Sequence, residues 1–438
     1  MKFLALLLTF CALPGPAQDA KASVERAYLF AYPLVLMDAT RAVALSRQPA
    51  NTFNHAVAFP DDRFRAVVRP NADTLYSTAW LDLAAEPVML HVPDTKGRYY
   101  LMQIMDAWTE TIAAPGKRTT GTGEQWFAIV GPSWKGVLPK NVQRIDCLTN
   151  WAWVIGRTQT NNAEDYENVH AIQRGYQLTP LSAYPNAPVA PRVPLSAGSP
   201  ALPPPLAVDR MTAAEFFARF RELLKQNPAH AADSAALSDV EAATRDASHN
   251  QQSIEEGVAE AKAMLKKSLE EAPASKDVWG SGPANVGRYG IHYAARAVIA
   301  RIGLGALPPE DAIYRNSSRD IAGDEFDGSK TYLMHFEKGK LPPVSAFWSL
   351  TMYDEQGYFV ANPIHRYAIG DRDKLKFNDD GSLDIRIQHT PPEAGDQSNW
   401  LPAPAGHFRL SLRMYWPGAA IVEGKWTPPA VMAVCGSC

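Results

Sequence analysis

Residues 99–105 read Tyr99-Tyr-Leu-Met-Gln-Ile-Met105, residues 125–130 read Gln125-Trp-Phe-Ala-Ile-Val130, and residues 150–155 read Asn150-Trp-Ala-Trp-Val-Ile155. Each run has the length of a β-strand and is rich in the aromatic and β-branched side chains that strands favour. Glycine and proline separate the runs, as at Gly131-Pro132, and these residues are typical of turns. Because short strands follow one another without intervening helices, this region is predicted to be an antiparallel β-sandwich.

The same signal returns near the C-terminus. Leu383-Asp-Ile-Arg-Ile-Gln388 and Phe408-Arg-Leu-Ser-Leu-Arg-Met-Tyr415 alternate apolar and polar residues, as strands with one buried face do. Asp379-Asp380-Gly381-Ser382 before the first run is predicted to be a turn, because it lacks the spacing and the downstream glutamate of a calcium loop. A second β-sandwich is therefore predicted, over residues 308–438.

Between the two predicted sandwiches, the apolar residues change to helical spacing. Thr212-x-x-Glu215 and Ser253-x-x-Glu256 are capping boxes followed by apolar residues at that spacing. A third helix is predicted from Asn285 to Ile302, ended by glycine and proline. The predicted fold class is mainly β with a helical middle domain over residues 205–307.

The first residues have the pattern of a secretory signal. Met1-Lys2 is positively charged, Phe3–Leu13 is apolar, and Gly15-Pro16-Ala17 offers small residues, so residues 1–17 are predicted to be removed after Ala17. The mature protein is expected to be periplasmic or secreted. Residues 18–204 would then form the N-terminal sandwich domain, with a leading helix and a proline-rich linker.

One later stretch is strongly apolar. Ala27–Val43 contains Pro33, Asp38 and Arg41, and charged groups are expensive in lipid. It is therefore predicted to be a buried helix bent at its proline, and no integral membrane segment is expected.

Composition and motifs exclude several functional classes. The 438 residues carry 43 basic and 46 acidic side chains, a net charge of −3, whereas nucleic-acid binding needs a basic excess. Phosphate-binding loops, dinucleotide fingerprints, zinc-hydrolase motifs and nucleophile elbows are absent from the sequence, and neither a cofactor nor a metal is expected. Cys147 is predicted to be a small buried side chain. Cys435 and Cys438 are predicted to form a tail disulfide or inert thiols, with redox and metal-binding roles left open.

The first candidate site is a polar segment that leads into a strand, Arg69-Pro70-Asn71-Ala72-Asp73-Thr74-Leu75-Tyr76-Ser77. Asn71 and Asp73 offer hydrogen bonds, Arg69 offers a charge, and Tyr76 offers a ring. One interpretation is a ligand site presented by a turn. The other is an Asx-turn in which Asp73 pairs with Arg69.

Two further motifs place polar groups among aromatic residues. Asp106-Ala-Trp108-Thr-Glu110 follows a predicted strand, so Asp106 and Glu110 could act as an acid/base pair, with the pKa of one carboxyl raised by burial. The plainer interpretation is a charged strand end. Arg366, in Asn362-Pro-Ile-His-Arg366, could hold an anion or a sugar hydroxyl.

These motifs resemble a bacterial family pair. Asn71-x-Asp73-Thr-Leu-Tyr76-Ser77 and the Trp108 region resemble domain of unknown function 1254. The C-terminal half resembles domain of unknown function 1214, through Phe347-Trp-Ser-Leu-Thr-Met-Tyr-Asp354, Asn362-Pro, Arg366-Tyr367, Gly381-Ser-Leu383, Asn399-Trp400-Leu-Pro402 and Trp426-x-Pro-Pro429. The resemblance implies an Ig-like sandwich, a helical middle domain and a C-terminal jelly-roll sandwich. It implies no established reaction.

Two functional hypotheses follow. In the first, the protein is a periplasmic hydrolase-like enzyme that acts on a glycan or small polar substrate. Its acid/base residues would be Asp73 with Glu110 or Asp106, and its binding residues would be Arg69, Asn71, Tyr76, Trp108 and Arg366. In the second, it is a non-catalytic ligand-binding or envelope protein. Either could form a homo-oligomer. A sharp pH optimum would favour the enzyme, and stacked exposed Trp and Tyr without an ionisable pair nearby would favour the binding protein. The most useful single observation is whether the segment from Asn71 to Tyr76 shares a cleft with Arg366.

Overall fold

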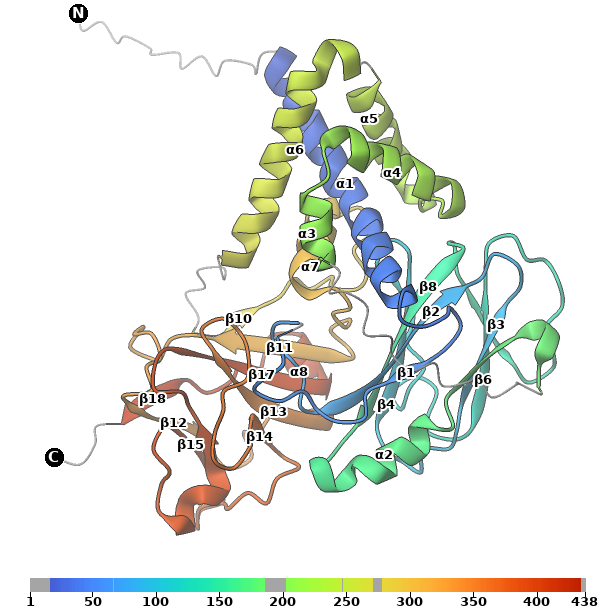
Figure 1. Cartoon of the computed structure of the whole chain (residues 1–438). Helices are drawn as coiled ribbons and strands as arrows, with labels where there is room; N and C mark the ends of the chain where they lie inside the picture. Colours follow the sequence, from blue (N-terminus) through green and yellow to red (C-terminus); the bar gives the residue numbers. More distant parts are fainter. Residues whose placement is uncertain (1–15, 66, 186–201, 246, 271–277, 435–438) are drawn as a thin grey trace, which may run out of the picture.

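The computed structural model describes residues 16–65, 67–185, 202–245, 247–270 and 278–434. Two β-sandwiches lie side by side, and a layer of helices stands over the junction between them (Figure 1). The predicted class, mainly β with a helical middle region, is confirmed. The predicted signal segment lies almost wholly outside the described residues, as do Cys435 and Cys438.

The N-terminal sandwich consists of two sheets that enclose an apolar core. The core includes Tyr100, Phe127 and the buried thiol Cys147, as expected for a small apolar side chain. The first sheet has the order β1 (Asn54–His55), β2 (Thr74–Asp82), β8 (Trp151–Gln159), β4 (Tyr100–Asp106), β5 (Thr111–Ala113). The second has the order β7 (Gln143–Asp146), β6 (Gln125–Val130), β3 (Val88–Val92), β9 (Gln177–Pro180).

The C-terminal sandwich is built in the same way, around a core that includes Trp348, Leu412 and Ile385. Its first sheet has the order β10 (Gly280–Ser281), β11 (Ala312–Ser317), β17 (Phe408–Pro417), β13 (Val344–Asp354), β14 (Ala368–Gly370). Its second has the order β16 (Trp400–Pro402), β15 (Leu383–Gln388), β12 (Thr331–Phe336), β18 (Val431–Val434). Pairing is antiparallel except between β6 and β7 and between β15 and β16. The prediction of an antiparallel N-terminal sandwich missed the parallel β6–β7 pair.

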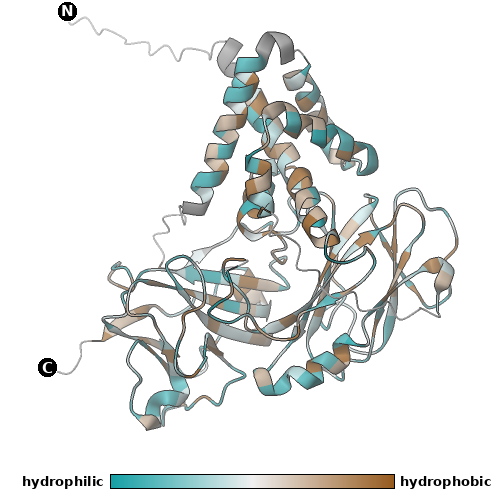
Figure 2. Cartoon of the chain, in the orientation of Figure 1, coloured by the Kyte–Doolittle hydropathy of each residue, from teal (hydrophilic) through white to brown (hydrophobic). Residues whose placement is uncertain are grey.

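The helical layer is organised around α1 (Pro16–Leu45), which is buried through most of its middle turns. Around it pack α3 (Pro204–Asp209), α4 (Ala213–Gln226), α5 (Ser234–Thr244), α6 (Ala247–Glu270) and α7 (Tyr293–Gly303). Figure 2 shows strongly apolar residues on the part of α1 that approaches the sheets, whereas hydrophilic residues mark the outer helices. Gly257 of α6 lies so close to α1 that an added Cβ would be 2.7 Å from the Lys21 carbonyl oxygen.

This packing bears on the predictions for the leading helix. The apolar residues of α1 contact α3 to α7 and also Trp80, Met105 and Trp151 of the N-terminal sandwich, so the helix joins the helical layer to that sandwich. The segment Ala20–Leu45 is also long and apolar enough to cross a membrane, and 56% of its most apolar window is buried inside the protein. An apolar N-terminal helix is compatible with an export signal.

The sequence predicted one helix start correctly and two incorrectly. The capping box of Thr212 and Glu215 begins α4 as predicted. Ser253 lies within α6, which begins at Ala247, so the second predicted start was wrong. The third helix begins at Tyr293, eight residues after the predicted Asn285, because residues 285–292 form turns instead.

The two sandwiches meet through the outer faces of their first sheets. The apolar part of this interface is a cluster of Tyr99, Leu101, Ala312, Phe347 and Tyr415. Along β17 the alternation of side chains directs Leu410, Leu412 and Met414 into the C-terminal core and the residues between them to the interface. The candidate site lies beside this cluster.

Candidate functional site

The segment from Asn71 to Asp73, just before β2, is fastened into the interface between the sandwiches. Asn71 Oδ1 accepts hydrogen bonds from the backbone N–H groups of Asp73 (2.7 Å) and Thr74 (2.9 Å), which is the predicted Asx-turn. Asn71 Nδ2 donates to the hydroxyl of Tyr415 in the C-terminal sandwich, at 2.8 Å. One side chain therefore shapes the turn and joins the two domains.

Asp73 is fully buried and its carboxylate is surrounded by donors from the C-terminal sandwich. Ser349 Oγ donates to it at 2.8 Å and the Tyr415 hydroxyl at 3.3 Å, and Arg372 forms an ion pair with it. Arg413 Nη1 lies 3.8 Å from the same carboxylate. A buried carboxylate needs such compensation, and here a neighbouring domain supplies it.

The expected pairing of Asp73 with Arg69 is not found. Arg69 adopts a positive φ of 52° and donates its backbone N–H to the carbonyl of Gly357, at 2.7 Å. Its own carbonyl accepts a hydrogen bond from Arg413 Nη2, at 3.0 Å. Arg69 therefore contributes backbone contacts to the interface, while arginines distant in sequence neutralise Asp73.

A cavity of about 610 Å³ opens beside Asp73, with walls from both sandwiches. Asp73 and Arg366 both line it, so the structure brings these two predicted site residues into one cleft. Its aromatic lining consists of Phe59, Tyr166 and Tyr367, and its charged lining consists of Asp61, Asp73, Glu164, Asp373, Arg366 and Arg372. The lining thus carries more carboxylates than guanidinium groups.

Arg366 is held in place by its own turn. Its Nη1 donates to the carbonyls of Gln397 (2.8 Å), Ser398 (3.3 Å) and Trp400 (2.7 Å). Asn362 closes the turn by accepting the N–H of Arg366, at 2.9 Å. The turn presents His365 at the cavity, exposed and with a positive φ of 49°. Such a conformation is uncommon for a residue other than glycine.

The second predicted motif is located elsewhere. Asp106 lies opposite Ala152 on β8, whereas the carbonyl of Asp73 accepts the N–H of Thr160, just beyond the other end of that strand. At about 3.3 Å per residue, the two carboxylates are about 25 Å apart along the sheet. The structure therefore does not bring Asp106 and Glu110 together with Asp73.

Asp106, Trp108 and Glu110 instead dock the helical layer onto the N-terminal sandwich. Asp106 Oδ2 accepts a hydrogen bond from His230 Nε2 at 2.6 Å, and this contact, together with Asp233, raises the pKa of His230 to about 10. Trp108 is buried and donates to the carbonyl of Pro228, at 3.1 Å.

Glu110 contacts the helical layer through Arg296 of α7. The Glu110 carboxylate accepts the backbone N–H groups of Tyr289 and Gly290, at 2.9–3.1 Å, and pairs with Arg296 at 2.7 Å. Backbone donors and one arginine therefore surround the Glu110 carboxylate, and they fasten residues 289–290 and α7 to the N-terminal sandwich.

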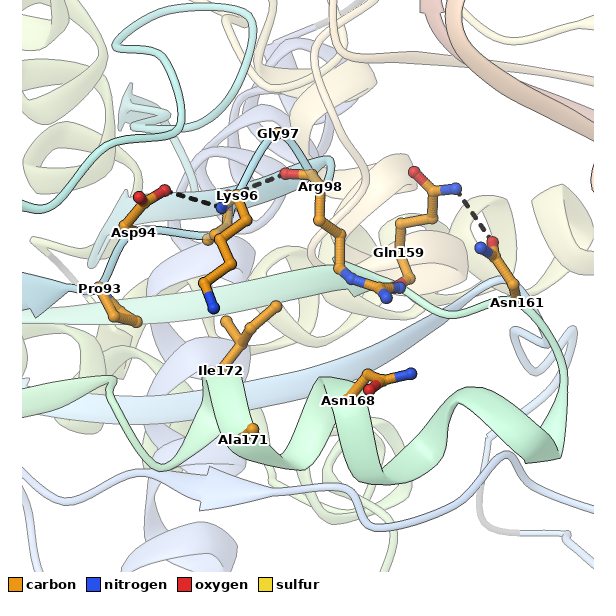
Figure 3. A pocket seen from close by; sticks show the side chains of 11 residues that line it. Pro93, Asp94, Lys96, Gly97, Arg98, Gln159, Asn161, Asn168, Ala171 and Ile172 are labelled. Carbon is orange, nitrogen blue, oxygen red and sulfur yellow. Dashed lines mark hydrogen bonds between the residues drawn. The ribbon is translucent and has the colours of Figure 1, made fainter.

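A second cavity, of about 630 Å³, lies in the N-terminal sandwich between α2 (Tyr166–Gln173) and the turn formed by residues 93–98 (Figure 3). Lys96 and Asn168 line it from opposite sides, and Asn161 lines both cavities. Arg98 is committed to a two-bond ion pair with Asp165, at 2.5 and 2.8 Å. All residues that line this cavity belong to the N-terminal sandwich, so it does not lie between the two domains.

Sequence reasoning missed the residues of the C-terminal half that surround Asp73. They are Ser349, Arg372, Arg413 and Tyr415. For β17, the sequence itself contained a pattern that could have identified Arg413 and Tyr415. The predicted alternation of Phe408–Tyr415 leaves arginine, serine and tyrosine on one face, and that face is too polar to pack against a purely apolar layer.

Comparisons with known proteins agree with this organisation. A family model described as protein of unknown function (DUF1254) matches residues 50–180, and a second (DUF1214) matches residues 311–419. No curated protein matches the chain.

Two solved structures are similar. The VPA0106 protein from Vibrio parahaemolyticus is 26% identical, with a TM-score of 0.71 over 95% of this chain and 100% of its own. An uncharacterised protein from Burkholderia cenocepacia is 10% identical, with a TM-score of 0.45 over 95% of this chain and 93% of its own. The chain belongs to the family of proteins in which DUF1254 is followed by DUF1214, two domains of unknown function.

Proposed function

We propose that this chain is a ligand-binding protein whose cavity between the two sandwiches holds a small polyhydroxylated molecule such as a sugar. The observation that carries the proposal is the cavity of about 610 Å³ with walls from both domains. Concave sites of this size at domain interfaces, with aromatic walls and a few convergent polar groups, are typical of ligand pockets.

The lining indicates the chemistry of the ligand. Phe59 and Tyr166 pack edge to face, with ring centroids 5.5 Å apart, and offer an aromatic wall. Asn161, Asn162 and Glu164 are exposed at the rim and offer hydrogen-bond donors and acceptors. Since carboxylates outnumber guanidinium groups in the lining, a neutral or cationic ligand is favoured over an anion.

The hydrolase hypothesis receives less support. Its acid/base pair required Asp73 together with Glu110 or Asp106, and these groups lie at opposite ends of β8. Asp73 is also fully buried and bonded to Arg372 and Ser349. The oxygens of such a carboxylate are occupied by protein donors, so it is poorly placed to contact a substrate.

We also propose export, with cleavage after Ala17. The support is the charged, apolar and small-residue order of residues 1–17 and the apolar helix that follows. N-terminal sequencing of the protein from a cell-envelope fraction should begin at Gln18. An intact Met1 in a cytoplasmic fraction would contradict export.

The binding proposal is tested by titrating the full chain with glucose, maltose, glucosamine and glucuronate in a calorimeter. We expect binding of a neutral or amino sugar and no binding of glucuronate. Glu164→Gln should weaken glucosamine binding about tenfold, the loss expected for one charge-assisted hydrogen bond, and leave the melting temperature unchanged. Lys96→Gln, in the other cavity, is the control and should change nothing. Preferential binding of glucuronate would overturn the assignment.

A further inference from the structure

Each sandwich presents a cross-strand pair of one arginine and one tyrosine at the interface. In the N-terminal sandwich, Tyr76 on β2 is directly opposite Arg157 on β8. In the C-terminal sandwich, Tyr314 on β11 is directly opposite Arg413 on β17. Each guanidinium lies over its tyrosine ring, 5.1 Å from the Tyr76 centroid and 5.5 Å from the Tyr314 centroid.

The two pairs meet where the sandwiches join. Burial raises the pKa of Tyr314, and the nearby guanidinium groups of Arg157 and Arg413, one from each sandwich, oppose this effect. The Tyr415 ring is 6.1 Å from the Tyr314 ring and connects the cluster to Asn71. We refer to Tyr76, Arg157, Tyr314 and Arg413 as the arginine–tyrosine clamp.

The clamp has more positive charge than its partners neutralise. Arg157 is 5% exposed, and its hydrogen bonds go to neutral groups: Gln103 Oε1 (2.9 Å), the Gly305 carbonyl (2.8 Å) and the Tyr76 hydroxyl (3.4 Å). Arg413 is 4% exposed, and its Nε and Nη1 have no hydrogen-bond partner among the described residues. The carboxylate nearest to it, Asp73, is already paired with Arg372.

Burying a guanidinium group without a counter-charge costs free energy, and buried donors without partners are rare in folded proteins. Arg157 has no carboxylate partner among the described residues, and Arg413 has two unpartnered donors and shares Asp73 with Arg372. Within the same described part of the chain, Thr351 Oγ1 and the Tyr99 hydroxyl are also unpartnered. Tyr76 and Tyr314 are only partly buried, so solvent reaches the tyrosine edge of the cluster. None of the four clamp residues lines the cavity proposed above for a polyol.

We infer that the arginine–tyrosine clamp is a second binding site, which holds the carboxylate of a small organic acid between the two sandwiches. A carboxylate matches the planar fork of a guanidinium group, and such bonds are among the strongest in proteins. Tyrosine hydroxyls can donate to the same oxygens. A bound acid would supply the missing negative charge and link the two domains.

The test is calorimetric titration of the full chain with acetate, succinate and inorganic phosphate at low ionic strength. We expect a carboxylate to bind more tightly than phosphate and to raise the melting temperature. Arg157→Lys keeps the charge but loses the fork, and should weaken binding at least tenfold. Tyr314→Phe keeps the ring and should weaken binding about fivefold to tenfold.

Arg301→Lys is the matched control. Arg301 is already satisfied by a two-bond ion pair with Asp209, at 2.7 and 3.1 Å, so this variant should bind the acid like the wild type. Tyr76→Phe serves as a second hydroxyl deletion if Arg157→Lys fails to fold. The inference is overturned if no carboxylate binds at millimolar concentration, if phosphate binds as tightly, or if binding survives both Arg157→Lys and Tyr314→Phe.

Discussion

The segments 69–77 and 106–110 each combine at least one carboxylate with an aromatic residue, yet they have different surroundings. Each segment joins two units of the fold. Asp73 is neutralised by arginines of the C-terminal sandwich and forms part of a cavity wall. Asp106 is fully buried and bonded to His230 of the helical layer, and it lines neither described cavity. A buried carboxylate with its own cation indicates a structural contact between units, and of these two carboxylates only Asp73 also lines a described cavity.

The comparison is tested most strongly by removing the carboxylate at the domain joint. Asp73→Ala leaves Arg372 and Arg413 buried without a counter-charge, so we expect the free energy of unfolding to fall by about 3–5 kcal/mol. Urea denaturation measures this change. Asp61→Ala is the control, since its ion pair with Arg63 is exposed and such pairs contribute at most about 1 kcal/mol. Equal effects of the two substitutions would contradict the role assigned to Asp73.

The contact between the helical layer and the N-terminal sandwich should make stability depend on pH, through His230. The folded-state pKa of His230 is raised to about 10, first by its hydrogen bond to Asp106 and then by Asp233. Because the pKa is raised above the unfolded value of about 6.5, the contribution is complete below that pH and is lost as the pH rises towards 10.

Thermal melts between pH 6 and 10 should therefore show a decline in the melting temperature of the wild type. In His230→Gln this decline should be smaller, because the titrating group is absent. A decline of the same size in both proteins would show that His230 does not carry the pH dependence.

A smaller effect on stability is expected from Glu110, at the same contact between the helical layer and the N-terminal sandwich. Glu110→Gln keeps an acceptor for the N–H groups of Tyr289 and Gly290 but removes the charge that pairs with Arg296. We expect a loss of about 1–3 kcal/mol in the free energy of unfolding. Proteolysis of the native protein should cut the 285–292 segment faster in this variant. Unchanged cleavage there would mean that Glu110 does not hold this segment.

The local pattern of the sequence predicts much of the fold. The alternation in Leu383–Gln388 corresponds to β15, and the aromatic run Gln125–Val130 corresponds to β6. The start of the third helix was misplaced because residues 285–292 form turns, with Gly287 and Gly290 at positive φ. The N–H groups of Tyr289 and Gly290 donate to Glu110, a carboxylate 179 and 180 residues away in the chain, and a local pattern cannot show such a contact.

The candidate site was only half predictable for the same reason. The Asx-turn of Asn71 depends on neighbouring residues and is visible in the sequence. The partners of Asp73 are not, because Ser349, Arg372 and Arg413 are hundreds of residues away and become neighbours only when the sandwiches pack. Arg366 could be placed near Asp73 only from the folded chain.

The most direct test of the account is to fill the cavity between the sandwiches without disturbing the contacts of Asp73. Ala163 is exposed and lines that cavity, and Ala171 is exposed and lines the other one. Calorimetric titration of Ala163→Trp with the sugar that binds the wild type should show binding abolished, at an unchanged melting temperature. Ala171→Trp should bind normally. Normal binding by Ala163→Trp would contradict the assignment of the interdomain cavity as the ligand site.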